Sequence, residues 1–381
     1  MIEAAYFYSK LVEKGVGFFS GVPDSLLKDF CAYITDHSDK KNHIIAVNEG
    51  AAVGLACGYH LATGSIPLVY MQNSGIGNAV NPLLSLADNE VYRIPLVLVI
   101  GWRGEPGVHD EPQHIKQGKV TCSLLESMGI PCAVLEKDED SVNSQIETCF
   151  KTIAETGSSY AFVIRKDTFA PYILQKKEEH DAVMTREEAI EEIAAHRGGI
   201  IVSTTGMISR ELYELRDKTT SGHERDFLTV GSMGHTSSIA LSIALQKPQL
   251  QVTCLDGDGA ALMHMGSFAA VGTQKPRNYC HIVLNNAAHD SVGGQPTIAP
   301  LIDIPAVARA CGYIHVYQAK IKEELKNILA KKNEGLTFIE VKVKKGARKD
   351  LGRPKTTPQE NKAAFMKFIE EHNLRVTEPF D

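Results

Sequence analysis

The chain has 381 residues, 43% of them hydrophobic, which is enough to bury a sizeable core and predicts two or three domains. Its net charge of −6 argues against a nucleic-acid partner, because nucleic-acid-binding proteins present a basic surface. Without a membrane-length apolar run, a signal peptide or a CxxC pair among its eight cysteines, the sequence favours a cytoplasmic protein with reduced thiols and no membrane partner.

Apolar, β-branched runs alternate with amphipathic stretches along the chain. The runs expected to form strands are residues 44–47, 67–71, 95–100, 161–164, 199–203, 227–230, 251–255, 282–284 and 337–343. This alternation predicts βαβ units, and therefore an α/β fold of doubly wound, mostly parallel sheets covered by helices on both faces. Ligands of such folds bind at the carboxyl ends of the strands.

The apolar pattern lapses once, over residues 170–183, which contain Pro171 and a run of charged residues. The capping-box sequence from Thr185 to Glu188 then predicts the start of a new helix. We therefore expect two α/β domains, 1–169 and 184–381, joined by a linker at 170–183. They match in size and class, although no sequence repeat relates them.

The first half carries two candidate acids. Asp24 lies in Gly21-Val22-Pro23-Asp24-Ser25, where it is either a helix N-cap or, as the family resemblance given below implies, an acid that approaches the substrate. Glu49 opens a helix of small residues, a position at which the helix dipole favours a negative charge. An ordinary first-turn acid is the alternative interpretation of Glu49.

Two further loops of this half follow expected strands. Residues 72–78 include Asn73 and Gly75, and residues 103–114 are dense in charged and histidine side chains, among them His114. Polar loops are usually just solvated. Both of these, however, lie at the edge of the sheet where ligands are expected.

The second half contains Gly257-Asp258-Gly259 and, 25 residues later, Asn285-Asn286. Each follows an apolar run, so adjacent strand ends would place a carboxylate beside a carboxamide. Glycine allows the backbone to approach a ligand closely, and Mg²⁺ takes oxygen ligands that it shares with phosphates. Either motif alone is common in turns, but the pair predicts a magnesium and diphosphate site.

This pair resembles the cofactor signature of thiamine-diphosphate enzymes. The resemblance implies that Mg²⁺ is bound by Asp258, Asn286 and the Ala288 carbonyl, although Ala287-Ala288 replaces a turn in which these enzymes commonly have glycine. It also implies that Glu49 hydrogen-bonds the aminopyrimidine ring and that Met233 bends the cofactor, unless Met233 is ordinary core. The implied cofactor-binding residues are Glu49, Asn73, Gly75, Gly231, Met233, Gly257, Asp258, Gly259, Ala260 and Asn286.

Within this superfamily, the chain is most similar to the phosphonopyruvate decarboxylase family, which has no middle domain. The segments that carry the resemblance are 21–25, 104–107, 110–114, 289–295 and 348–354. The family reaction converts 3-phosphonopyruvate to phosphonoacetaldehyde and CO₂, in phosphonate biosynthesis. Sulfopyruvate decarboxylases share several of these segments, and a carboligase of the acetohydroxyacid synthase type is a further alternative.

The resemblance also sets expectations for catalysis and assembly. The catalytic candidates are Glu49, Asp24, His114 and His289, with His109 as a further possible proton donor. The expected partner is a small anionic 2-keto acid, and the expected assembly is a homodimer or homotetramer with its active site between subunits. The basic segment 342–355 is either an anion site or a solvated surface.

Overall fold

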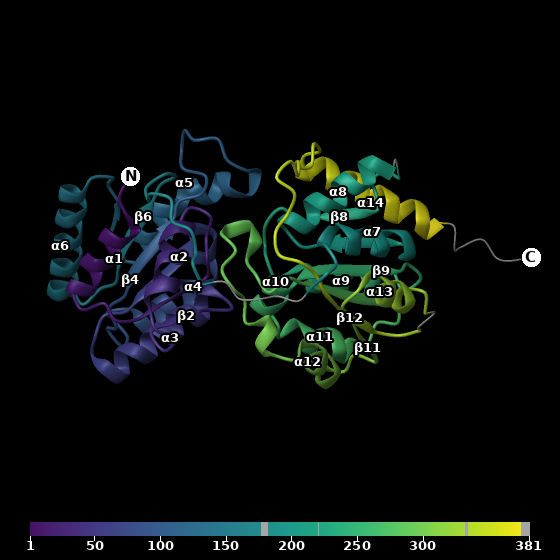
Figure 1. Ribbon diagram of the computed structural model, residues 1–381, viewed down its shortest axis with the longest axis horizontal. Helices are drawn as coiled ribbons and strands as arrows, with labels where there is room; N and C mark the ends of the chain where they lie inside the picture. Colours follow the sequence, from purple (N-terminus) through teal and green to yellow (C-terminus); the bar gives the residue numbers. More distant parts are fainter. Residues whose placement is uncertain (177–181, 220, 332–333, 375–381) are drawn as a thin grey trace, which may run out of the picture. The chain divides into compact units, whose positions relative to one another are not determined.

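The computed structural model describes residues 1–176, 182–219, 221–331 and 334–374. The chain forms two compact units, one of Met1–Glu178 with Ser291–Gln295 and the other of Glu179–Asp290 with Pro296–Asp381 (Figure 1). Residues 177–181 of the expected linker lie outside the described residues. Residues 170–176 run along the first unit, where Asp29 and Asp36 accept backbone hydrogen bonds from Tyr172 and Gln175.

The first unit contains a six-stranded parallel sheet in the order β2-β1-β3-β4-β6-β5. Its strands are β1 (Phe19–Gly21), β2 (His43–Ile45), β3 (Leu68–Gln72), β4 (Val97–Gly101), β5 (Cys132–Val134) and β6 (Tyr160–Ile164). Its main helices are α1 (Ala4–Glu13), α2 (Lys28–His37), α3 (Glu49–Thr63), α4 (Ile76–Pro82), α5 (Pro112–Ser127) and α6 (Glu139–Thr156).

Both faces of this sheet are buried. Phe162 of β6 belongs to one core cluster with residues of α1, α2 and α6, whereas its neighbours Ala161 and Val163 belong to a second cluster with residues of α3, α4 and α5. Successive strand residues point to opposite faces, so each face needs its own helical layer. Figure 1 shows helices on both sides of the strands.

The second unit contains a six-stranded parallel sheet in the order β11-β12-β10-β9-β7-β8. Its strands are β7 (Ile200–Ser203), β8 (Asp226–Leu228), β9 (Val252–Gly257), β10 (Tyr279–Asn285), β11 (His315–Ala319) and β12 (Thr337–Lys342). Its helices are α7 (Arg186–His196), α8 (Met207–Thr219), α9 (Thr236–Gln246), α10 (Asp258–Met263), α11 (Ser267–Gln274), α12 (Ile304–Cys311), α13 (Lys322–Leu329) and α14 (Pro358–Leu374).

These observations confirm the expected fold class, with two doubly wound parallel sheets. The expected capping box is also present, since Thr185 and Glu188 bond each other's backbone at the start of α7. All eight cysteines are free thiols. Among the described helices, none has both the length and the apolar character that a membrane crossing requires.

Candidate active site

In the first sheet, Asp24 lies where the chain leaves β1, next to the end of β3. Its carboxylate is fully buried and accepts hydrogen bonds from Gln72 Nε2 at 2.6 Å and from the Leu26 backbone N–H at 2.8 Å. Burial raises the pKa of Asp24, and these hydrogen bonds and the nearby Arg103 oppose the rise. Leu27 occupies the N-cap position of α2, so Asp24 lies in the turn before this helix and is not its N-cap.

Glu49 is the first residue of α3, and only 5% of its surface is exposed. The Asn48 side chain caps the helix by accepting the Ala51 N–H at 2.8 Å. Asn78 Nδ2 donates to Glu49 Oε2 at 2.8 Å, and a β-carbon at Gly75 would lie 2.4 Å from Glu49 Oε1. The structure therefore brings together two predicted site residues, Glu49 and Gly75.

Asn73 is oriented differently from these neighbours. Its Nδ2 donates to the Arg103 carbonyl at 2.7 Å and to Thr121 Oγ1 at 2.9 Å. Its Oδ1 accepts from the Arg103 N–H at 3.2 Å. The Asn73 carboxamide thus joins the ends of β3 and β4 to α5, and its role toward a cofactor stays a prediction.

The loop after β4 is held by an ion pair between Arg103 and Asp110, with two hydrogen bonds of 2.8 and 2.5 Å. His114 follows in α5 and is buried, and its Nδ1 has no partner among the described residues. Burial, followed by the positive charge of Arg103, lowers the pKa of His114. The neutral imidazole is therefore the favoured form of this side chain near neutral pH.

In the second unit, two predicted residues converge on Gly259. A β-carbon at Gly259 would lie 3.3 Å from the Met233 methyl group and 3.1 Å from His289 Cε1. Burial lowers the pKa of His289 to about 4, although the neighbouring Asp290 acts in the opposite direction. Met233 and His289 thus cover the turn that follows β9, and Gly259 permits their approach.

Asp258 and Asn286 leave adjacent strands at the same edge of the sheet, because β9 and β10 are paired with Gly257 opposite Leu284. Asp258 is 2% exposed and accepts from Thr297 Oγ1 at 2.5 Å. Burial raises its pKa from 3.8 to about 6, against the hydrogen bond from Thr297. Asn286 is also buried and donates from Nδ2 to Asp290 Oδ2 at 2.6 Å.

The turn after Asn286 has a defined geometry despite its alanines. Ala287 adopts φ 58°, in the left-handed region that favours glycine. Its carbonyl accepts from the Thr297 N–H at 3.1 Å. The pairing of Ala288 with Pro296 fixes the same turn.

These residues fit a hard cation such as Mg²⁺. Asp258 is a buried carboxylate with no Lys or Arg ion pair among the described residues, whereas the charge of Asp290 is balanced by its ion pair with Arg186. No donor within the described part of the chain bonds the Ala288 carbonyl. Oxygen ligands, two of them from carboxyl and carboxamide groups, are the set that Mg²⁺ prefers.

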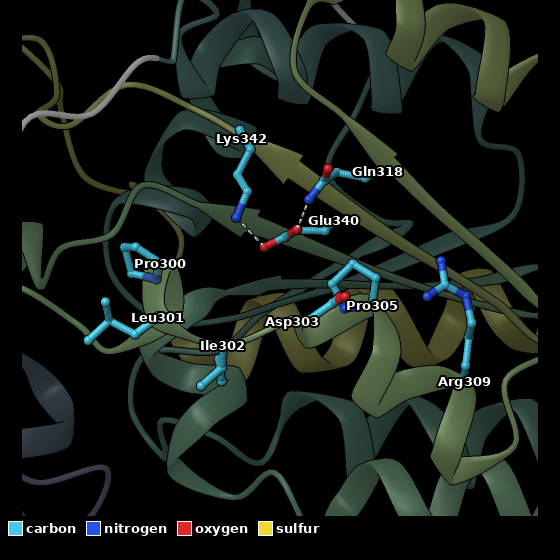
Figure 2. Close-up of a pocket in the computed structure, with 9 residues that line it drawn as sticks. All are labelled: Pro300, Leu301, Ile302, Asp303, Pro305, Arg309, Gln318, Glu340 and Lys342. Carbon is cyan, nitrogen blue, oxygen red and sulfur yellow. Dashed lines mark hydrogen bonds and ion pairs between the residues drawn. The ribbon is translucent and has the colours of Figure 1, made fainter.

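A cavity of about 430 Å³ lies at the carboxyl ends of β11 and β12 (Figure 2). In its wall, the buried Glu340 accepts from Lys342 Nζ and Gln318 Nε2, both at 2.6 Å. Glu340 also accepts from Asn285 Nδ2 at 2.7 Å. Glu340 therefore fixes the side chain of Asn285, which immediately precedes Asn286.

The basic segment 342–355 is less available to an anion than its composition indicates. Arg348 forms ion pairs with Glu187 at 2.6 Å, with Asp350 at 3.0 Å and with Glu214. Lys342 is paired with Glu340. These carboxylates balance the charges of Arg348 and Lys342.

The sequence did not single out Arg186 or Asp290. Asp290 Oδ2 accepts from Arg186 Nη1 at 3.0 Å as well as from Asn286. An acid four residues after the second asparagine was the only available signal, because the contact with Arg186 spans 104 positions.

Comparison with known proteins shows to which family this sequence belongs. Residues 2–122 match the N-terminal TPP binding domain of thiamine pyrophosphate enzymes, and residues 204–341 match the C-terminal TPP binding domain. Phosphonopyruvate decarboxylase from Streptomyces viridochromogenes is 35% identical over 97% of this chain and 95% of its own length. The chain belongs to the phosphonopyruvate decarboxylase family.

Members of this family have relatives that act on a different acid. Sulfopyruvate decarboxylase from Methanosarcina acetivorans is 27% identical over 94% of this chain and 95% of its own length. Sulfopyruvate decarboxylase subunit beta from Methanothermobacter thermautotrophicus is 35% identical over 43% of this chain and 84% of its own length. This chain is therefore a thiamine-diphosphate-dependent carboxy-lyase that decarboxylates a keto acid.

Proposed function

We propose that this phosphonopyruvate decarboxylase family member converts 3-phosphonopyruvate to phosphonoacetaldehyde and CO₂, with thiamine diphosphate and Mg²⁺, in phosphonate biosynthesis. The observation that supports this substrate is the sequence identity over nearly the full length of the chain. It is 35% to a phosphonopyruvate decarboxylase and 27% to a sulfopyruvate decarboxylase. A difference of this size favours phosphonate over sulfonate and keeps sulfopyruvate as the second candidate.

Glu49 is proposed to hold a proton at the pyrimidine ring of the cofactor. Its carboxylate is buried, and Asn78 fixes one oxygen, which leaves Oε1 to face a ring nitrogen. Thiamine diphosphate supplies the electron sink for the loss of CO₂. Glu49 contributes a fixed, water-excluded proton carrier of the kind that general acid–base catalysis requires.

The metal is proposed to be held by Asp258, Asn286 and the Ala288 carbonyl. The backbone N–H groups of Gly259 and Ala260, at the start of α10, would face the diphosphate. Met233 and His289 pack against Gly259 and would exclude water from the same region.

The proton donor for the product is proposed to be Asp24. Burial raises the pKa of Asp24, so its protonated form persists to higher pH than that of an ordinary aspartate. Burial lowers the pKa values of His114 and His289, which leaves both imidazoles neutral and poorly suited to donate a proton. The two histidines instead serve to orient the substrate by hydrogen bonding.

A substrate panel tests the reaction. The enzyme, loaded with thiamine diphosphate and Mg²⁺, is given phosphonopyruvate, sulfopyruvate or pyruvate, and release of CO₂ and aldehyde is measured. We expect turnover of phosphonopyruvate and none after Glu49→Gln. Turnover of sulfopyruvate alone would reassign the substrate, and a product carrying an added acceptor acid would indicate a carboligase.

We further propose a homodimer or homotetramer that shares its active sites between subunits. A related enzyme is described as a subunit, which supports an assembly of chains. Mixing unfolded Glu49→Gln and Asp258→Ala chains and refolding them should restore about a quarter of the wild-type sites if each site takes residues from two chains. Sites built within one chain would give no recovery.

A further inference from the structure

Arg186 lies next to the proposed metal site, and its described hydrogen bonds go to Glu211, Asp290 and Gly346 and to none of the proposed ligands. We propose that Arg186 is a positioning residue that orients the Asn286 carboxamide, acting through Asp290, so that the Asn286 oxygen faces the cation. This inference rests on the proposed role of Asn286 as a metal ligand.

The Asn286 carboxamide has to be fixed in one of two orientations. Its oxygen can bind a cation, whereas its NH₂ group can only donate hydrogen bonds. The NH₂ group donates to Asp290 Oδ2 at 2.6 Å, and within the described residues the oxygen accepts one hydrogen bond, from the Ala288 N–H at 3.2 Å. A strong acceptor on the nitrogen side therefore selects the orientation that presents the oxygen.

Asp290 can play this role only while its own carboxylate is held in place. Its Oδ2 accepts three hydrogen bonds, from Asn286, from Arg186 Nη1 at 3.0 Å and from the Gly346 N–H at 2.9 Å. Without these bonds, the Asp290 carboxylate would be drawn toward a cation held by Asn286 and would release the Asn286 NH₂ group. The Arg186 charge offsets that attraction.

Arg186 is itself rigidly held. It is 5% exposed and bonds Glu211 of α8 through Nε at 2.7 Å and Nη2 at 2.8 Å. The guanidinium group is a planar fork, so two bonds to Glu211 leave Nη1 aimed at Asp290. The chain thereby couples α7 and α8 to the turn that carries Asn286.

Stability alone does not account for this arrangement. Arg186 is the first residue of α7, where the helix dipole disfavours a positive charge. A buried ion pair also contributes little net stability, because desolvation opposes the attraction. A role in holding Asp290 explains why an arginine occupies a position that is unfavourable on both counts.

The same unit supplies a matched control. Arg216 is 3% exposed and forms an equally buried, two-bond ion pair with Asp226, at 2.7 and 3.0 Å. Neither partner has a hydrogen bond to Asp290, Asn286 or Asp258 among the described contacts. Removing Arg216 leaves the buried Asp226 unpaired, and removing Arg186 leaves Glu211 and Asp290 unpaired, so both variants should lose stability, Arg186→Met by at least as much.

The test measures cofactor retention, not activity. Binding of thiamine diphosphate is followed by equilibrium dialysis over a series of Mg²⁺ concentrations for wild type, Arg186→Met and Arg216→Met, with thermal unfolding of each cofactor-free protein. We expect both variants to unfold at lower temperature. Only Arg186→Met should raise the half-saturating Mg²⁺ concentration, by about 10- to 100-fold.

Equal Mg²⁺ dependence in the two arginine variants would overturn the inference. If Arg186→Met does not fold, Asp290→Asn takes its place, because it keeps the shape and removes the acceptor charge; unchanged Mg²⁺ dependence there would also overturn it. Asp258→Ala separates the two proposals. If it leaves Mg²⁺ dependence intact, the metal site itself is wrong; if it abolishes the dependence while Arg186→Met does not alter it, only the role of Arg186 is wrong.

Discussion

At the scale of single residues, Gly75 determines where the Glu49 carboxylate lies. A β-carbon at position 75 would come within 2.4 Å of Glu49 Oε1 and 2.6 Å of its Cδ, closer than nonbonded atoms approach. Gly75→Ala must therefore displace the carboxylate. We expect about a 100-fold fall in kcat with the fold retained, because a displacement of about 1 Å can have that effect.

Gly77→Ala is the control for this change. Apart from its chain neighbours and the backbone of its own helix, no described atom lies within 4 Å of a β-carbon at Gly77, the second residue of α4. This variant should keep its activity and gain about 0.5–1 kcal/mol of stability, since alanine favours a helix. Steady-state kinetics and urea unfolding measure both effects, and a fully active Gly75→Ala enzyme would contradict the proposed role of Glu49.

The buried carboxyl group of Asp258 makes the stability of the cofactor-free protein depend on pH. Its pKa rises from 3.8 to about 6 in the folded chain, so the folded state binds this proton more tightly than the unfolded state. The Asp258 carboxyl therefore does not change the free energy of unfolding below about pH 4, and it lowers this free energy as the pH rises to about 6. The penalty then stays constant at higher pH.

Asp258→Asn removes this penalty while keeping an acceptor for Thr297. We expect the variant to exceed the wild type in free energy of unfolding by about 2–3 kcal/mol near neutral pH, and by about zero near pH 4. Urea unfolding of the cofactor-free proteins across this pH range measures the difference. A difference that does not change with pH would show that the Asp258 carboxyl is not desolvated.

At the scale of elements, four helices, α3, α6, α11 and α12, end at a residue in the left-handed conformation. Helices α3, α6 and α12 end at a glycine in the left-handed conformation: Gly64, Gly157 and Gly312. Helix α11 ends instead at the exposed Lys275, with φ 47°. Lys275→Gly should raise the free energy of unfolding by about 0.5–1 kcal/mol, because glycine avoids the left-handed strain.

Lys275→Ala separates backbone strain from side-chain effects. Alanine has a β-carbon and meets the same strain, so this variant should match the wild type within about 0.5 kcal/mol. Equal stabilisation by Gly and Ala, measured by urea unfolding, would assign the effect to the lysine side chain.

The elements that could be predicted from the sequence are those whose environment is uniform along the strand. Strand β4 is buried on both faces and reads as a continuous apolar run. Strand β1 was not predicted, because it ends at Gly21 and glycine is depleted in strands. That glycine is required by the Tyr70 carbonyl, which lies 2.0 Å from where its β-carbon would be, a contact invisible in the sequence.

The same distinction applies to the site. Asp258 and Asn286 could be paired from the sequence, because the carboxyl ends of neighbouring parallel strands meet at one edge. Arg186 could not be found, since its contact with Asp290 depends on how α7 lies beside the turn after β10. Site residues whose place depends on strand register could be predicted, whereas Arg186, whose place depends on helix packing, could not.

At the scale of the whole molecule, the two sheets share one topology. If the strands of the second unit are counted from its first strand, β7, the second sheet has the same strand order as the first sheet. The match appears when one of the two sheets is read from its opposite edge. Glu49 follows β2 as Met233 follows β8, and Asn73 follows β3 as Asp258 follows β9. Equivalent strand ends thus carry different chemistry in the two units.

Because each unit has a complete sheet with its own core, each should fold alone. In the first unit, the Ile2 backbone bonds Thr168 and Ala170 at 2.9 and 2.8 Å, which ties together its two ends. We expect fragments 1–176 and 182–381 each to unfold cooperatively, as followed by circular dichroism during heating.

A shorter fragment tests whether the complete sheet is what matters. Ending the first fragment at Gly157 removes β6, which lies between β4 and β5 and fills both faces of the core. This fragment should lose its cooperative transition, because β5 is left without a neighbour and the core is opened. A cooperative 1–157 fragment, or an unfolded 1–176 fragment, would place the domain boundary elsewhere than the linker expected at 170–183.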